Sequence, residues 1–414
     1  MQAEAREKIE TGRVTSTLRV LAVSSIFPNS VQPNRGIFNG CGLEQLSKIA
    51  AVRVVSPVKW FPGLGWASAS ERLLSKIPRE DNWRGIQVTY PRFFRTPGFG
   101  RRWHGWFYRH SLEKHIEQVV NEFKPDVLLA IWAHPDGVAM QQIGERLRIP
   151  VVIKCMGSDI HQLLKEGARG EQIIASMNKC ARVITVSQGL RKMLIDRGLP
   201  PGHIDVVYNG VDRKVFRPIP RTEARRKLKL PVHGKLILCV ANLLSIKRHC
   251  DLLDAFRMLR QEIDAKLVLI GEGPLRKQLE ELCWELRIAH DVRFVGACAH
   301  DSIPLWMNAC DLVCLSSANE GLPNVLYEAL ACGRPVVSTA VGGVPELVSS
   351  PEYGRLVKPG DIAGFAAELK DVLGRAWDPQ RLAACPQVIT WEQSAQRLFG
   401  TIQRVHDEYN RVRF

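Results

Sequence analysis

The chain contains the stretch Glu320-Gly321-Leu322-Pro323-Asn324-Val325-Leu326-Tyr327-Glu328, which holds two carboxylates eight positions apart. The short apolar run 311–315 before it is typical of a buried strand, and apolar residues recur at helical spacing after it. We therefore predict a strand, a loop with Glu320 and a helix with Glu328. Such a junction points free N–H groups and a positive helix dipole at its ligand, which suits a phosphate, while carboxylates can bind sugar hydroxyls. This predicts a nucleotide-sugar site, and the alternative is two solvated glutamates on a surface loop and helix.

A second junction of this kind lies earlier in the same half of the chain. The run 236–241 is typical of a strand, and residues 251–259 carry a helical apolar pattern. Lys247 and Arg248 lie between them. A lysine at the carboxyl end of a parallel strand faces the crevice in which open α/β sheets bind ligands, so it could neutralise a diphosphate. The alternative is a solvated Lys-Arg pair.

Several further motifs occur in a specific order between about Ser24 and Glu392. They are Phe27-Pro28, Arg35-Gly36-Ile37-Phe38, Gly157-Ser158-Asp159, Thr185-Val186-Ser187, Asn209-Gly210-Val211-Asp212, Gly271-Glu272-Gly273-Pro274, Phe294-Val295-Gly296 and Gly342-Gly343-Val344-Pro345-Glu346. Together with the two junctions they make the chain resemble a family 4 glycosyltransferase. The resemblance implies an α/β protein of GT-B architecture, with two facing Rossmann-like domains, parallel sheets and a donor/acceptor cleft between them. It also implies transfer of a sugar from a nucleotide donor with retention of anomeric configuration.

The resemblance assigns roles in donor binding to residues of the second half. Glu320 would contact hydroxyls of the donor sugar, and Glu328 would accept hydrogen bonds from the ribose. Backbone N–H groups near Asn324 and Leu326 would bind the diphosphate, and the backbone of Val295-Gly296 would border the base.

The cations of the second junction would stabilise the charge of the leaving nucleotide. Relatives commonly have Gly-Arg five residues before the lysine, where this chain has Ala241-Asn242. Half of the usual cationic clamp is therefore missing, and Arg248 is the candidate substitute beside Lys247.

On the acceptor side, Gly36 would let backbone approach the diphosphate from across the cleft because glycine has no Cβ; a tight turn is the alternative. Many relatives carry a histidine where this chain has Ile131, so His134 is a shifted candidate and a structural histidine the alternative. Asp159, after the strand-like run 151–153, is the stronger acceptor-side candidate, with a helix N-cap as its alternative. The predicted catalytic set is Glu320, Lys247, Asp159 and His134.

Length and alternation predict the domain organisation. With 414 residues, the chain is long enough for two domains. We expect a mobile arm at 1–17, an acceptor-binding domain at 18–209, a linker at 210–234 and a nucleotide-sugar-binding domain at 235–389. Residues 390–414 would form a helix that crosses back to the first domain, or a plain terminal helix. Eleven cysteines without a C-x-x-C motif predict reduced thiols in a cytoplasmic protein.

No Asp-x-Asp triplet occurs in the chain, so no motif for a metal that holds the diphosphate is present. We therefore predict metal-independent transfer without a cofactor. The net charge of +15 suits a nucleic-acid-binding protein, but its cations are spread over both halves and match no nucleic-acid module. A sugar-nucleotide epimerase of the same fold, or an inactive partner of a transferase, is a further alternative. The E-x7-E stretch favours the transferase, with a UDP- or GDP-sugar as donor.

Residues 82–112 contain no Asp or Glu, and the segment 92–109 interleaves arginines with Phe, Trp and Tyr. Trp and Tyr favour the headgroup region, and basic residues bind anionic leaflets. We therefore expect the protein at the inner face of the cytoplasmic membrane, with a lipid-linked saccharide acceptor used in cell-surface polysaccharide synthesis. The alternative is that these aromatic residues pack in the core and the arginines are solvated.

Overall fold

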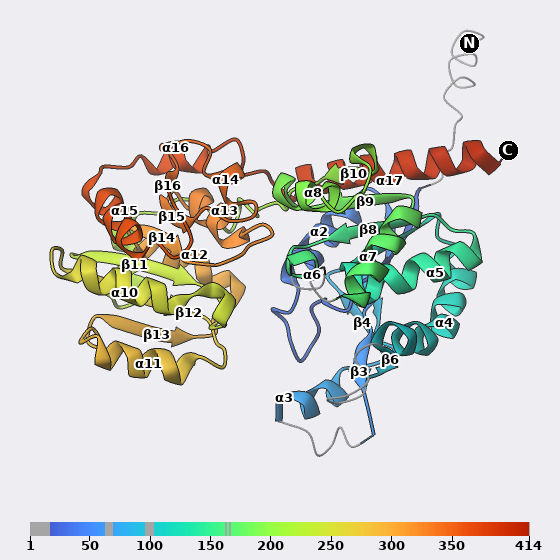
Figure 1. Ribbon diagram of the computed structural model, residues 1–414, viewed down its shortest axis with the longest axis horizontal. Coiled ribbons are helices and arrows are strands. Elements are labelled where there is room, and N and C mark those ends of the chain that lie inside the picture. Colours follow the sequence, from blue (N-terminus) through green and yellow to red (C-terminus); the bar gives the residue numbers. More distant parts are fainter. Residues whose placement is uncertain (1–16, 63–68, 96–102, 162–163, 165–166, 414) are drawn as a thin grey trace, which may run out of the picture.

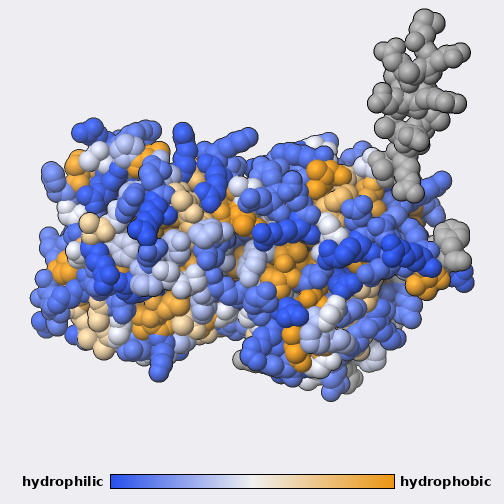
Figure 2. Space-filling view, turned by 90° about the horizontal axis from the view of Figure 1, so that it is seen from above, coloured by the Kyte–Doolittle hydropathy of each residue, from blue (hydrophilic) through white to orange (hydrophobic). Residues whose placement is uncertain are grey.

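The computed structural model describes residues 17–62, 69–95, 103–161, 164 and 167–413, and it contains two large sheets with helices on their faces (Figure 1). The two sheets belong to two Rossmann-like bodies that stand side by side, so the predicted GT-B architecture is confirmed. Seen from above, both present a mainly hydrophilic surface (Figure 2). The predicted arm 1–17 lies outside the described residues except for its last position. No helix in the described ranges is long and apolar enough to cross a bilayer.

The first sheet has the strand order β10-β9-β8-β7-β1-β2-β5-β4, and only β4 runs antiparallel to its neighbour. Its central strands are fully buried because helices cover both faces, which explains their continuous apolar runs. The strands are β1 Arg19–Val23, β2 Ala51–Val55, β4 Glu80–Trp83, β5 Ile86–Thr89, β7 Val127–Ile131, β8 Val151–Cys155, β9 Arg182–Thr185 and β10 Ile204–Val206. The helices are α2 Ile37–Leu46, α3 Ala69–Arg72, α4 His104–Phe123, α5 Val138–Leu147, α6 Ser158–His161, α7 Ala168–Lys179 and α8 Gln188–Ile195.

The second sheet is entirely parallel, with the order β13-β12-β11-β14-β15-β16. Its strands are β11 Lys235–Val240, β12 Ala265–Ile270, β13 Val292–Gly296, β14 Leu312–Leu315, β15 Val336–Thr339 and β16 Gly354–Val357. Its helices are α9 Arg221–Lys227, α10 His249–Arg260, α11 Arg276–Glu285, α12 Ile303–Ala309, α13 Asn324–Ala331, α14 Val344–Leu347, α15 Ile362–Gly374 and α16 Pro379–Ala383. Strand order therefore reverses between β11 and β14, the strands that precede the two predicted junctions.

The segment 210–234, expected as a linker, is only partly one. Its second half forms α9, which packs on α12 of the second body. Arg225 of α9 is buried and donates to the carbonyl oxygen of Ala309 at 2.8 Å and to Asp311 at 2.9 Å. The basic composition of this segment therefore reflects an internal ion pair as well as a solvated surface.

The last helix, α17 Trp391–Arg413, packs against α2 of the first body. Thr390, just before this helix, forms an isolated parallel bridge with Val211, which follows the last strand of the first domain, β10. The two segments that connect the bodies, one after β10 and one before α17, therefore lie next to each other at the top of Figure 1.

Four short strands were not predicted from the sequence. They are the hairpin strands β4 and β5 and the small parallel pair β3 Val58–Trp60 and β6 Arg92–Phe94. Strand β6 falls inside the segment 92–109. Phe93 and Tyr108 of that segment are buried, so part of the expected membrane-binding stretch packs in the core as the alternative supposed.

Candidate active site

The carboxyl ends of β11 and β14 form the centre of the candidate site, because strand order reverses between them. Ligands of open α/β sheets bind outside the strands at such a reversal. The loop after β11 carries Lys247, and the loop after β14 carries Glu320. Ser316 joins the two loops, since its hydroxyl lies 2.9 Å from the carbonyl oxygens of both Lys247 and Arg248.

Lys247 and Glu320, distant in sequence, form an ion pair in this structure. The Lys247 Nζ lies 2.6 Å from Oε1 of Glu320, and the Ser317 hydroxyl donates to the same oxygen at 2.6 Å. The Glu320 side chain is 10% exposed and that of Lys247 is 22% exposed. The ammonium group is therefore held at the crevice by a carboxylate whose position is itself fixed.

Arg248 adopts a left-handed backbone conformation with φ 49°, which turns it away from Lys247 as α10 begins. Its guanidinium pairs with Asp251 of the same helix at 2.6 Å and is 41% exposed. The hydrogen bond that Arg248 donates to Asp251 raises the pKa of Arg248. The structure thus offers a second cation beside the crevice, already engaged by a carboxylate.

Glu328 lies inside α13 with its side chain only 7% exposed. Its Oε1 pairs with Nε2 of His300 at 2.9 Å. Burial lowers the pKa of His300, but the hydrogen bond and charge of Glu328 outweigh it, so the pKa lies above its ordinary value. The His300 ring also meets Phe38 of the first domain edge to face, with centroids 5.8 Å apart.

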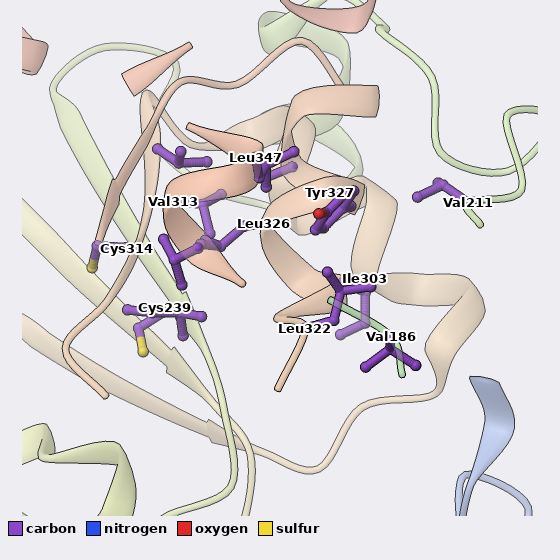
Figure 3. Packing of buried hydrophobic residues seen from close by; sticks show 14 of the residues in the cluster. Val186, Val211, Cys239, Ile303, Val313, Cys314, Leu322, Leu326, Tyr327 and Leu347 are labelled. Carbon is purple, nitrogen blue, oxygen red and sulfur yellow. The ribbon is translucent and has the colours of Figure 1, made fainter. Parts of the chain in front are cut away.

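The start of α13 differs from the expected phosphate cradle. The Asn324 amide donates to the Leu322 carbonyl at 3.0 Å, and the Leu326 amide donates to the Pro323 carbonyl at 2.9 Å. The side chain of Leu326 is buried in the core cluster (Figure 3). Both predicted amides therefore already have acceptors, because the turn at Pro323 folds back on them.

Val295 and Gly296 end β13, the edge strand that β12 separates from β11. Gly296 has φ 87°, and its carbonyl accepts from the Gly271 amide at 2.9 Å. The following loop reaches across the cleft, where the Asn34 side-chain amide donates to the Cys298 carbonyl at 3.3 Å. The strand end therefore lies where the loop of Gly36 approaches the second domain.

Gly36 has an identifiable structural role at the start of α2. Its φ is 62°, and a Cβ there would lie 2.3 Å from the carbonyl oxygen of Ile26. Only glycine fits both constraints. The turn role that the sequence left open is thus present, on a loop that faces the second domain.

The two domains touch directly beside Glu320. A Cβ on Gly157 would lie 2.5 Å from the Cα of Gly321, so these backbones meet without side chains between them. The His161 ring lies 3.1 Å from the carbonyl oxygen of Glu320 through Nε2. Farther along, Glu346 accepts from the amides of Gln188 and Gly189 at 2.9 and 2.8 Å.

Asp159, the stronger predicted acceptor-side residue, does not face the cleft. It is fully buried and accepts hydrogen bonds from the amides of Ala133 at 2.9 Å, Met156 at 3.1 Å and Gly157 at 2.7 Å. Burial raises its pKa, and these bonds partly offset the shift. In this geometry the carboxylate fixes the loops after β7 and β8, a structural role close to the capping alternative, and the catalytic role of Asp159 stays a prediction.

His134 lies in the loop after β7 and lines a cavity of about 750 Å³ in the first domain. Burial, and next the charge of Arg169, lower its pKa to about 4, so the ring is neutral at pH 7. The ring of His104 lies 5.8 Å away, and its pKa is lowered to about 4 by burial, His134 and two arginines. Ser158 lines the same cavity next to Gly157, so the cavity reaches the domain contact beside Glu320.

Sequence reasoning missed two residues of the site, His161 and His300. Each follows a quoted motif by a few positions, His161 after Gly157-Ser158-Asp159 and His300 after Phe294-Val295-Gly296. A histidine that closely follows the end of a strand was the available signal.

Comparison with solved structures agrees with this architecture. A HepE structure from Anabaena in complex with UDP-glucose has a TM-score of 0.69 and 22% sequence identity, covering 94% of this chain and all of that one. This likeness concerns the fold.

Sequence comparison identifies the family. A family model described as Glycosyl transferases group 1 matches residues 220–383, and one described as Glycosyltransferase Family 4 matches residues 65–215. The N-acetyl-alpha-D-glucosaminyl L-malate synthase of Bacillus anthracis is 30% identical over 64% of this chain and 69% of that protein. The putative teichuronic acid biosynthesis glycosyltransferase TuaC of Bacillus subtilis strain 168 is 27% identical over 84% of this chain and 87% of that protein. The chain is therefore a member of the family 4 glycosyltransferases.

Proposed function

We propose that this glycosyltransferase moves a hexosyl group from a nucleotide sugar to a lipid-linked saccharide, with retention of configuration and without a metal. The observation that carries the proposal is the Lys247–Glu320 pair at the strand reversal, opposite a cavity of the first domain. Lys247 supplies a cation and Glu320 a fixed carboxylate on one side of the cleft, and the cavity on the other side offers space for an acceptor.

The donor half of the proposal rests on the charges of the second domain. Lys247 would meet the diphosphate, while Glu320 would hold the sugar hydroxyls and Glu328 the ribose. The Anabaena structure in complex with UDP-glucose supports a nucleotide sugar as donor class. Val295 and Gly296 would border the base through backbone atoms.

The chemical step follows from the absence of an assigned nucleophile among these carboxylates. The acceptor hydroxyl would attack the anomeric carbon on the face from which the diphosphate leaves. The bond between that carbon and the diphosphate oxygen breaks as the new glycosidic bond forms, and the hydroxyl proton passes to the leaving diphosphate. Lys247, fixed by Glu320, would stabilise the developing charge electrostatically.

The lipid-linked acceptor is supported by exposed aromatic residues on the first domain. Trp60, Trp103 and Trp106 are 45%, 51% and 48% exposed, and Leu73 is 43% exposed. Trp favours the headgroup region of a bilayer. The arginine contribution is smaller than the sequence suggested, since Arg92 donates to the carbonyls of Tyr90 and Ile77. Arg101 and Arg102 lie outside the described residues.

This surface would place the protein at the inner face of the cytoplasmic membrane, where a lipid-linked acceptor for surface polysaccharide synthesis is made. TuaC, by its name, belongs to teichuronic acid biosynthesis, which is the same type of process.

A thermal-shift screen over UDP-, GDP- and ADP-sugars tests the donor assignment. A ligand at 100 times its Kd stabilises the folded chain by about 2.7 kcal/mol, which raises the Tm measurably. We expect the sugars of one nucleotide to raise the Tm of the wild type and to leave the Tm of Lys247→Ala unchanged. No shift with any nucleotide sugar at millimolar concentration would contradict the proposal.

A further inference from the structure

Glu320 lies in a loop whose backbone is not part of a helix or a strand. Strand β14 ends at Leu315, helix α13 begins at Asn324, and the described residues 316–323 between them are irregular. The carboxylate of Glu320 is held by Lys247 and Ser317, both at 2.6 Å. These two contacts fix the end of the side chain. The orientation of the main chain at Glu320 depends on what its peptide groups contact.

The first domain supplies such a contact through His161, the last residue of α6. Helix α6 lies on the side of the first body that faces the second (Figure 1). Nε2 of His161 lies 3.1 Å from the carbonyl oxygen of Glu320. A carbonyl oxygen can only accept a hydrogen bond, so Nε2 must carry the proton and donate it. The planar peptide links this oxygen to the Cα of Glu320, so the bond also limits the directions of the side chain.

The backbones around this hydrogen bond are packed closely. A Cβ on Gly321 would lie 2.6 Å from the Cα of Gly157, and a Cβ on Gly342 would overlap the carbonyl oxygen of Glu320. The amide of Gly343 donates to the carbonyl of Gly321 at 3.1 Å. The peptide after Glu320 is therefore enclosed between the first domain and the loop after β15. Separation of the two domains would remove one of these two supports.

The loop that carries His161 is itself fixed by hydrogen bonds. The buried carboxylate of Asp159 accepts from the amides of Met156 at 3.1 Å and Gly157 at 2.7 Å. The carbonyl of Gly157 accepts in turn from the amides of Ile160 and His161, both at 2.9 Å. Asp159 thus holds the turn from which the His161 ring reaches the second domain.

We propose that His161 is a positioning residue that holds the main-chain carbonyl of Glu320 and thereby keeps the Glu320 carboxylate directed at the donor sugar while the domains are in contact. The inference rests on the proposed transferase function and adds a residue of the first domain to its donor site. Ser158 of the same loop lines the cavity of the first domain. One loop therefore borders both the proposed acceptor space and Glu320.

Hydrogen exchange tests the positioning without any ligand. We expect His161→Phe, which keeps a planar ring but has no donor, to raise deuterium uptake in the peptide that covers residues 316–323. His161→Gln, whose amide nitrogen can donate in place of Nε2, should keep the wild-type uptake. His203→Phe is the matched control, because Nε2 of His203 lies 2.8 Å from the carbonyl oxygen of Met177 within the first domain. His161→Ala replaces His161→Phe if that variant fails to fold, and control-like uptake would overturn the proposal.

Titration calorimetry with UDP- and GDP-sugars, and with UDP and GDP, tests whether the effect reaches the carboxylate. Because the proposed partner of Glu320 is the sugar, His161→Phe should weaken nucleotide-sugar binding by about three- to tenfold, the effect of one hydrogen bond. Binding of the free nucleoside diphosphate should not change. Equal losses for both ligands, or affinities like those of His203→Phe, would overturn the proposal.

A double-mutant cycle, read as nucleoside diphosphate release, separates positioning from other roles. If His161 acts through Glu320, His161→Phe should slow turnover of the wild type but have little further effect on Glu320→Gln. Glu346→Gln is the comparison at a second domain contact, where Glu346 accepts from the amides of Gln188 and Gly189, and its effect should be the same in both backgrounds.

The glutamine variant decides between positioning and proton transfer. Turnover that falls as far in His161→Gln as in His161→Phe would make His161 an acid or base and overturn the proposal. A wild-type chain that turns over no donor would contradict the transferase proposal, and hydrogen exchange would still decide whether His161 positions Glu320.

Discussion

At the scale of single residues, Lys247 and Glu328 of the second domain are the proposed nucleotide-binding side chains. If they hold the nucleotide, Lys247→Ala and Glu328→Ala should each weaken nucleoside diphosphate binding by about 1.5–3 kcal/mol, the range for hydrogen bonds to charged groups. Titration calorimetry measures this loss. Lys277→Ala is the control, since Lys277 is 88% exposed on α11. If either folded variant binds the nucleoside diphosphate as tightly as the control does, the replaced residue does not belong to the donor site.

Glu320 should behave differently because its proposed partner is the sugar. We expect Glu320→Gln to bind the free nucleoside diphosphate with wild-type affinity while turnover falls at least tenfold. The amide keeps the size of the side chain but loses the charge that pairs with Lys247. Equal losses of affinity for the nucleotide and the nucleotide sugar would show that Glu320 contacts the nucleotide instead.

His104 gives a prediction about pH. Its folded pKa of about 4 lies below the ordinary 6.5, so between these values the unfolded chain binds a proton that the folded chain does not. Stability should therefore fall as pH falls through this window, by up to about 1.4 kcal/mol per pH unit. The raised pKa of Asp136 makes stability rise as pH falls, which is the opposite direction. Asp136 is present in both the wild type and the variant, so the difference between them reports on His104.

The comparison is between wild type and His104→Gln in urea unfolding at pH 7, 6, 5 and 4. The free energy of unfolding of the wild type should drop relative to the variant as pH decreases. Parallel curves would mean that His104 titrates normally.

The place of a residue in the site could be predicted where a motif fixed the position of that residue. It could not be predicted where burial decided the direction of the side chain. Glu320 and Lys247 each follow a strand in the sequence. They lie together because parallel strands end at the same edge of the sheet. Asp159 follows a strand in the same way, yet its carboxylate turns inward to three amides. The sequence contains the residue but not the direction of its side chain.

At the scale of elements, the surface around the start of α4 is the part of the molecule that the account places on a membrane. Replacing Trp103 and Trp106 together with Ala should reduce flotation with anionic vesicles, because both rings are about half exposed and would enter the headgroup region. Trp284→Ala on α11, where the ring is 66% exposed, is the matched control. Wild-type protein that remains in the soluble fraction on anionic vesicles at low salt would contradict membrane binding.

The elements that sequence reasoning missed are short or atypical. Strand β5 has four residues and pairs with β4 across a turn at Arg84 and Gly85, both with positive φ. Helix α9 was taken for a linker because its arginines and lysines resemble a solvated segment. Arg225 is buried because Asp311 and the Ala309 carbonyl, both far away in sequence, accept its hydrogen bonds. The central strands β11 and β14 were predicted because burial on both faces gives them continuous apolar runs, although β14 is no longer than β5.

At the scale of the whole molecule, transfer should continue in excess EDTA. The diphosphate charge would be met by Lys247, with Arg248 beside it, rather than by a bound metal. The rate of transfer with and without EDTA, and after addition of magnesium or manganese, measures this. Activity that chelation abolishes and a divalent metal restores would refute metal independence.

The domain arrangement also allows the proposed function to be tested in one reaction, because donor and acceptor would meet beside the contact between Gly157 and Gly321. The most direct measurement follows nucleoside diphosphate release from UDP- and GDP-sugars together with the product formed on a polyprenyl-diphosphate-linked saccharide. We predict equal amounts of released nucleotide and glycosylated lipid, an unchanged anomeric configuration, and loss of both products in Lys247→Ala. Recovery of an epimerised nucleotide sugar, or no turnover of any donor with any lipid-linked acceptor, would contradict the account.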